Sequence, residues 1–306
     1  MRIKEYFLRG PRLGLHFMLT SRALACLSPK ARERRADYGR AILPLPPKSL
    51  EPGFEAPNIK DPAGLAELVR EAARGARGGG RDAALLLPET CQKSFVLAFE
   101  GFPPRAGERR EWILWRLRKQ MPSLPEDVRL SYDAASNGSP RRVFASLARS
   151  SVIREYESLF ASCGFKLRMI GLPILGLLNL LDRQGERDVL LVNIEADAVS
   201  LLALLDGQPA LYRLKPFLAG KDLVPDVLAA AVAREIAGTK RFLEDREKRA
   251  VAAVWVRAGA GGDPAELLAG LKAGLELPVR RLDAPPSSGF NQREGHFLGP
   301  LIGAAS

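Results

Sequence analysis

The chain has 306 residues, a length that fits two domains of roughly 150 residues each better than one compact core. Its 46% hydrophobic and 26% charged residues, with a mean hydropathy of −0.07, are typical of a globular protein and exclude wholesale disorder. The uncharged run near the middle, at residues 169–181, is shorter than the roughly 18 apolar residues that span a bilayer, and the basic start lacks a secretory apolar segment. We therefore expect a cytoplasmic protein.

The net charge is +11 and the pI is near 9.9, and the charge is concentrated at one end. Residues 1–40 hold ten basic and three acidic residues. Such an end attracts anionic lipid headgroups by about 1 kcal/mol per basic residue near the surface. A solvated basic face is the simpler interpretation. We predict no nucleic-acid partner, because the sequence has no recognised binding motif.

The first part of the chain predicts a unit of strands with one helix. Three short apolar runs between turn-forming or charged residues predict strands at residues 13–17, 23–27 and 41–45. Asp61 is a helix N-cap, and Pro62 takes the first helical position after it. Apolar residues then recur at helical spacing further along the chain. The apolar run at residues 83–88 predicts a buried strand, so the predicted order is βββαβ.

The next segment predicts a small subdomain inserted at about residues 92–166. A strand, a helix, two strands, a helix and a strand are expected at residues 94–100, 107–120, 128–132, 142–148, 152–162 and 166–170. This is the split βαβ order, and Asn137-Gly138 predicts the hairpin turn. Trp112 and Trp115 lie three residues apart on the first of these helices. Core packing is their favoured interpretation, and anchoring of a partner is the alternative.

The second half repeats the βββαβ order after an apolar helix at residues 173–181. Strands are predicted at residues 189–194, 199–205, 210–214, 251–256 and 279–282, and helices at 223–244 and from Asp263-Pro264 to 273. Asp206-Gly207 predicts the turn between the second and third strands. We expect two similar domains across a cleft, at residues 1–181 and 182–306, with a C-terminal helix at about 297–305 returning to the first domain.

The reactive side chains give no catalytic constellation. Cys26, Cys91 and Cys163 are widely spaced and odd in number, which excludes a disulfide framework and a C-x-x-C metal clip. His16 and His296 stand at opposite ends of the chain, which disfavours a histidine-based triad or zinc site. The P-loop, dinucleotide-binding and nucleophile-elbow motifs are absent from the sequence. We therefore predict that the protein is not an enzyme and has no catalytic or metal-binding residues.

A glycine cluster at residues 258–262 follows an apolar strand and precedes a capped helix. Glycine lets the backbone approach a ligand, and a helix N-terminus favours anions. A plain strand-to-helix turn explains the cluster equally well.

The chain resembles the PilM family in the order and spacing of its segments, among them GLHFMLTSRALACL, AALLLPE, DVLLVNIEADAVSLLALLDGQPALYRL and AVAAVWVRAGAGGDPAELLAGLKAGLELPV. That family comprises actin-like cytoplasmic proteins of type IV pilus assembly, relatives of the cell-division protein FtsA. The resemblance covers nearly the whole chain. It implies an α/β, actin-like (ribonuclease H-like) two-domain fold.

The resemblance also implies a nucleotide cleft, here formed by Gly14, Thr20, Ser21, Asn193, Gly259, Gly261 and Gly262. The chain departs from the family pattern in both phosphate loops: His16 replaces an aspartate, and Met18 and Glu195 replace glycines. A carboxylate repels polyphosphate, and loss of the acidic positions removes the means of holding Mg²⁺. We therefore expect a degenerate cleft without a cofactor and without ATP hydrolysis. An active ATP-binding actin-like ATPase is the alternative.

The partners that the resemblance implies belong to pilus assembly. It implies a scaffold of a type IV pilus or related secretion machine. The first domain and its inserted subdomain would hold the cytoplasmic tail of a PilN-like inner-membrane protein, alongside other pilus assembly proteins. This places the chain at the inner face of the cytoplasmic membrane. The basic residues 1–40 are compatible with peripheral contact with anionic lipid.

Overall fold

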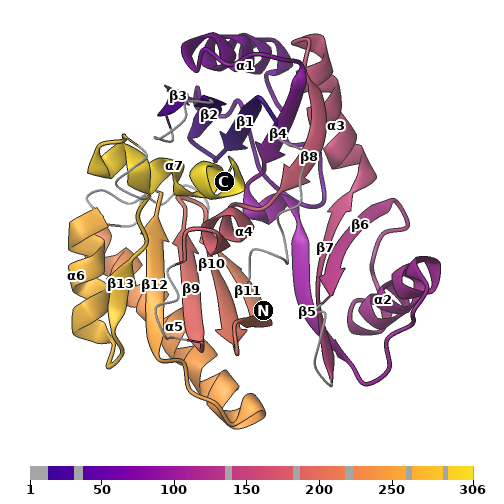
Figure 1. The fold of residues 1–306 in the computed structure, drawn as a ribbon, viewed down its shortest axis with the longest axis vertical. Coiled ribbons are helices and arrows are strands. Elements are labelled where there is room, and N and C mark those ends of the chain that lie inside the picture. Colours follow the sequence, from indigo (N-terminus) through magenta and orange to yellow (C-terminus); the bar gives the residue numbers. More distant parts are fainter. Residues whose placement is uncertain are drawn as a thin grey trace.

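The computed structural model describes residues 13–30, 37–134, 140–181, 187–217, 224–259, 264–284 and 289–305. These ranges form two five-stranded sheets and one three-stranded sheet. Figure 1 shows the two larger sheets with α4 and α7 between them, and the smaller sheet with α2 at the margin of the molecule. Within the described ranges, every helix is too short or too polar to cross a bilayer.

The first sheet has the order β3-β2-β1-β4-β8. Its strands are β1 Leu15–Leu19, β2 Ala23–Lys30, β3 Asp37–Pro44, β4 Asp82–Leu86 and β8 Lys166–Gly171. The strands β1 and β2 are antiparallel, whereas β1, β4 and β8 are parallel. The crossover to β4 is α1, Pro62–Gly75, and the Asp61 carboxylate accepts a hydrogen bond from the Gly64 N–H at 2.9 Å. The predicted N-cap is therefore confirmed.

The second sheet, β11-β10-β9-β12-β13, repeats this arrangement. Its strands are β9 Val189–Ile194, β10 Ala198–Leu205, β11 Gln208–Pro216, β12 Ala253–Ala258 and β13 Val279–Arg281, and its helices are α5 Pro225–Glu247 and α6 Pro264–Gly274. Asp206 and Gly207 form the predicted turn with φ of 52° and 73°, as a type I′ hairpin requires. The predicted βββαβ order occurs in both units, and each adds one more helix and strand. Asp263 lies outside the described residues.

The small sheet has the order β5-β7-β6 and follows a short 3₁₀ helix, η2. These elements are η2 Glu89–Cys91, β5 Lys93–Phe99, α2 Ala106–Gln120, β6 Val128–Ala134, β7 Arg141–Arg149 and α3 Ser150–Ser162. The predicted C-terminal boundary of the subdomain, at residue 166, is wrong, because α3 and β8 belong to the first unit. The subdomain is β-α-β-β and ends near residue 149. The turn at Asn137-Gly138 lies outside the described residues.

Tertiary packing is the reason for this difference. Tyr156 and Phe160 of α3 are buried in the core of the first sheet, and the Phe160 ring lies 5.0 Å from that of Phe17 in β1. The strand β8 pairs with β4, with Leu85 opposite Ile170. The helix and strand α3 and β8 thus occupy in the first unit the position of α6 and β13 in the second.

The tryptophans of α2 also differ from the expectation. The side chains that α2 buries against the small sheet are Ile113 and Leu117, one helical turn apart. Trp112 and Trp115 project from the other side of the helix and are 49% and 54% exposed. The favoured interpretation of core packing is wrong, because the single sheet below α2 covers only one face of it.

Two helices fill the space between the large sheets: α4 Pro173–Leu178 and α7 Gln292–Ala305. They approach closely, since a Cβ at Gly176 would overlap the Pro300 carbonyl. On its other side, α7 packs Leu298 and Leu301 against Met18 and Leu27 of the first sheet. The C-terminal helix therefore lies against both units.

Candidate functional site

The loops that the sequence places in a nucleotide cleft meet between the two large sheets. Thr20, directly after β1, and Asn193, near the end of β9, line the same small cavity. Its volume is about 10 Å³, room for about one water molecule, whereas pockets for small ligands measure about 300–1,000 Å³. The structure brings these two predicted residues together and leaves little space between them.

The β1–β2 turn satisfies its own backbone amides. The Thr20 hydroxyl accepts hydrogen bonds from the N–H groups of Arg22 and Ala23 at 3.2 and 2.9 Å, and the Thr20 N–H donates to the Ala23 carbonyl. Ser21 is half-buried at the tip of this turn. A phosphate-binding loop directs free N–H groups at its ligand, whereas these three are used within the turn.

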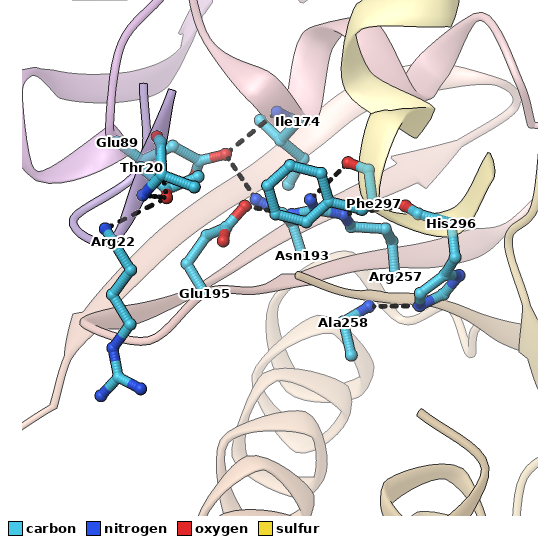
Figure 2. A network of polar contacts seen from close by, with 11 residues as sticks. Thr20, Arg22, Glu89, Ile174, Asn193, Glu195, Arg257, Ala258, His296 and Phe297 are labelled. Carbon is cyan, nitrogen blue, oxygen red and sulfur yellow. Dashed lines mark hydrogen bonds and ion pairs between the residues drawn. The ribbon is translucent and has the colours of Figure 1, made fainter. Parts of the chain in front are cut away.

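Arg257, at the end of β12, fills the centre of the cleft (Figure 2). Its buried guanidinium donates to the Asn193 amide oxygen at 2.9 Å, to the Glu195 carboxylate, and to the Phe297 carbonyl at 2.7 Å. Burial raises the pKa of Glu195, and the Arg257 charge opposes that rise. The expected repulsive carboxylate is therefore neutralised by a residue that the sequence analysis did not consider. An arginine ending an otherwise apolar strand was the available signal.

His296 of α7 closes the same side of the cleft. Its Nε2 accepts a hydrogen bond from the Ala258 N–H at 2.9 Å, and its Nδ1 lies 3.0 Å from an Asp283 carboxylate oxygen. This pairing holds a proton on Nδ1 and keeps Nε2 as the acceptor. Figure 2 shows the Phe297 ring beside the Arg257 side chain. The backbone carbonyls of α7 and the rings of His296 and Phe297 therefore fill the space that faces the end of β12.

The predicted glycines separate in the structure. Gly259 follows β12 and borders an open groove of about 430 Å³ that α7 lines on the other side. A Cβ there would collide with Arg257 and Glu195, so this glycine makes room for the ion pair. Gly14 lies before β1, at the strand end opposite Thr20, and approaches the Gly79 carbonyl. It is not brought to the cleft. Gly261 and Gly262 lie outside the described residues.

A second group that the sequence analysis missed is Glu89 in η2. Its carboxylate accepts hydrogen bonds from the Ile174 N–H at 3.0 Å, the Asn193 amide at 3.3 Å and the Tyr212 hydroxyl at 2.9 Å. Burial raises the pKa of Glu89 to about 7, although these donors favour the ionised form. The carboxyl group therefore ties η2 to α4 and to the second sheet. Its position directly after an apolar strand was the only sequence signal.

A separate groove of about 220 Å³ lies where the small sheet meets the first large sheet. It is lined by β6, β7, α3 and β8. Among the described strands, β6 pairs with β7 alone and β8 with β4 alone, so each is an edge strand. Edge strands present unpaired backbone groups to another extended chain.

One polar atom in this groove lacks a partner. The Gln92 side chain is 92% buried, and its amide oxygen accepts from the Ser146 hydroxyl at 2.8 Å. Its amide nitrogen makes no hydrogen bond in the described part of the chain. A buried donor without an acceptor costs free energy. Arg129 and Glu157 form a bidentate ion pair across the groove, at 2.6 and 3.0 Å.

Comparison with solved structures places this arrangement in a known fold. A chain of the PilM-PilN type IV pilus biogenesis complex matches with a TM-score of 0.80 and 18% identity, over 96% of this chain and 98% of that one. A Bacteroides thetaiotaomicron protein with an actin-like ATPase fold matches with a TM-score of 0.52 and 11% identity, over 97% of both chains. The cytoplasmic domain of EpsL, an inner membrane component of the Vibrio cholerae type II secretion system, matches with a TM-score of 0.50 and 12% identity. The match covers 95% of this chain and 93% of that domain. No protein-family model and no curated protein sequence matches the chain.

The class of protein follows from these matches and from the repeated sheets. The chain has the two-domain actin-like ATPase fold, as the sequence predicted. Within that class its architecture is PilM-like, because the match to the PilM-PilN chain spans nearly all of both chains at a high TM-score.

Proposed function

We propose that this protein is a scaffold of a type IV pilus or related secretion assembly machine, which binds the cytoplasmic tail of a PilN-like inner-membrane protein without hydrolysing ATP. The observation that carries the proposal is the whole-chain likeness to a chain of the PilM-PilN complex, at a TM-score of 0.80. The protein then works at the inner face of the cytoplasmic membrane, beside other pilus assembly proteins.

The groove between the small sheet and β8 is the proposed site for the tail. Two edge strands flank it, so an extended peptide gains backbone hydrogen bonds by pairing with one of them. Half-buried apolar side chains of β8, Leu167 and Met169, offer contacts for alternate side chains of the peptide.

The cleft between the large sheets supports a function without nucleotide turnover. Arg257 and the α7 carbonyls occupy its centre, and the Thr20 turn offers few free amides. Such a cleft holds the two large sheets in one fixed arrangement. Binding of the tail would then proceed in nucleotide-free protein.

The experiment uses the full chain and a synthetic peptide with the cytoplasmic tail sequence of a PilN-like inner-membrane protein. Calorimetry should show binding by the native protein. Met169→Glu, in the groove, should weaken binding at least about tenfold, because burying an unpaired carboxylate is costly. Met121→Glu, the same change at a half-buried position ending α2, is the matched control and should bind normally. Absence of binding by the native protein would refute the proposed function, and equal binding by both variants would refute the groove.

A further inference from the structure

The exposed face of α2 combines tryptophan with concentrated positive charge. Trp112 and Trp115 are 49% and 54% exposed, the largest side chains among the exposed hydrophobic residues of the described chain. The Lys119 ammonium lies 3.8 Å from the Trp115 ring centre, on the same side of the helix. Side chains at positions i, i+3 and i+7 share one helical face. This face is opposite the one that Ile113 and Leu117 bury.

The charge of this helix is strongly unbalanced. Residues 105–120 hold six basic and two acidic residues, a net charge of +4 in sixteen positions. Arg116, Arg118 and Lys119 are exposed, and within the described residues none of them forms an ion pair. Their charge is therefore available to an external anionic surface.

The shape of this region favours a surface over a peptide as the partner. Figure 1 shows α2 at the outer margin of the molecule, with its free side directed away from both large sheets. A peptide requires a groove or an edge strand, and α2 presents a convex helical face. Indole rings partition to the membrane interface, and arginine and lysine bind anionic headgroups there.

We propose that the face formed by Trp112, Trp115, Arg116, Arg118 and Lys119 docks on an anionic lipid surface. The helix lies along the surface, with its indoles at the headgroup level and its cations against the phosphates. This assignment uses only the exposed side chains of this chain itself, and it does not depend on the proposed pilus function. It differs from contact through residues 1–40, which the composition suggested. It also orients the molecule, because β6 lies next to α2 and borders the peptide groove.

The test measures co-sedimentation of the full-length protein with phosphatidylcholine vesicles, with and without phosphatidylglycerol. The native protein should bind only the anionic vesicles and show a blue shift of tryptophan emission. Replacing Arg116, Arg118 and Lys119 together with glutamine should lower the partition coefficient about a hundredfold, at about fivefold for each basic residue. Trp112→Ser with Trp115→Ser should abolish the blue shift, although Trp255 remains.

Matched controls come from α5, which carries exposed basic and apolar residues on the second unit. The charge control replaces three exposed arginines with glutamine and so changes the net charge by the same amount as the α2 charge variant: Arg234, Arg241 and Arg246. The apolar control, Val227→Ser with Phe242→Ser, removes exposed apolar side chains. Both controls should bind anionic vesicles almost as the native protein does. Thermal denaturation should show that every variant is folded, since all these positions are exposed.

Three results would overturn the inference. Equal losses in the α2 and α5 charge variants would show that net charge alone attracts the protein. Undiminished binding of the α2 variants, with loss when the basic residues of 1–12 are replaced, would move the contact to the N-terminal segment. Absence of vesicle binding by the native protein, with an α2-dependent complex with an acidic protein, would identify the face as a protein interface.

Discussion

The guanidinium of Arg257 donates to the carboxylate of Glu195 between the two large sheets, with Asn193 and the Phe297 carbonyl as its further partners. A buried ion pair of this kind is stable only when its remaining donors are satisfied, and here Asn193 and α7 satisfy them. The pair therefore joins β9, β12 and the C-terminal helix in the place where the family resemblance implied a nucleotide cleft and the sequence analysis expected a degenerate one.

The first prediction concerns nucleotide. Adding ATP and Mg²⁺ should leave the melting temperature unchanged and release no phosphate, because Arg257 and α7 fill the cleft. A ligand at 100 times its Kd adds about 2.7 kcal/mol to the free energy of unfolding, so thermal shift detects binding readily. A rise with ATP would favour the active ATPase. Adenosine, which has no phosphates, is the control, because it tests binding in the open groove beside Gly259 separately from the phosphate loops.

The second prediction concerns the ion pair itself. Arg257→Met should lower the free energy of unfolding by about 3–5 kcal/mol, since it leaves Glu195 buried without a cation. Adding Glu195→Leu to this variant should recover part of the loss, because the unpaired charge is then removed. Denaturant unfolding measures both variants. Additive losses in the double variant would contradict the coupling.

The third prediction separates a structural from a ligand-binding role of Gly259. Gly259→Ala should lower the free energy of unfolding by about 1–3 kcal/mol without any ligand, because its Cβ would overlap Arg257 and Glu195. Gly107→Ala in α2 is the control: its Cβ meets nothing within 4 Å, and alanine there should stabilise by about 0.5–1 kcal/mol. Unchanged stability of the Gly259 variant would indicate that the ion pair tolerates a Cβ.

The fourth prediction concerns the pH dependence that Glu89 confers. Its folded-state pKa of about 7 lies above the value of 4.5 for a free carboxyl, so the folded protein holds a proton that the unfolded chain releases. The stability from this group is fully present below pH 4.5 and is lost as the pH rises through about 7, by up to about 3 kcal/mol.

Glu89→Gln should remove this loss, because its amide carries no charge at any of these pH values. Denaturant unfolding at several pH values from 5 to 8 compares it with the native protein and with Glu67→Gln, an exposed change on α1. The native protein and the Glu67 variant should show the same decline with pH. A parallel decline in the Glu89 variant would mean that another group carries it.

Much of the local structure was determined by the sequence itself. The Asp61 cap, the Asp206-Gly207 turn and the strand at residues 189–194 depend on neighbouring side chains and on burial patterns that a short window contains. The twofold βββαβ order follows from such local signals, and the actin-like fold was implied by the resemblance to the PilM family.

Three features were decided by tertiary structure alone. The helix and strand α3 and β8 joined the first sheet because β4 offered an unpaired edge across some eighty residues of chain, which no local pattern records. The side of α2 that faces solvent depended on where the small sheet lies, so Trp112 and Trp115 are exposed. Arg257 became the centre of the cleft only because β9 and α7, far apart in sequence, place their oxygens around it. A side chain's role in a cleft is determined by long-range contacts, and those form only when the whole chain has folded.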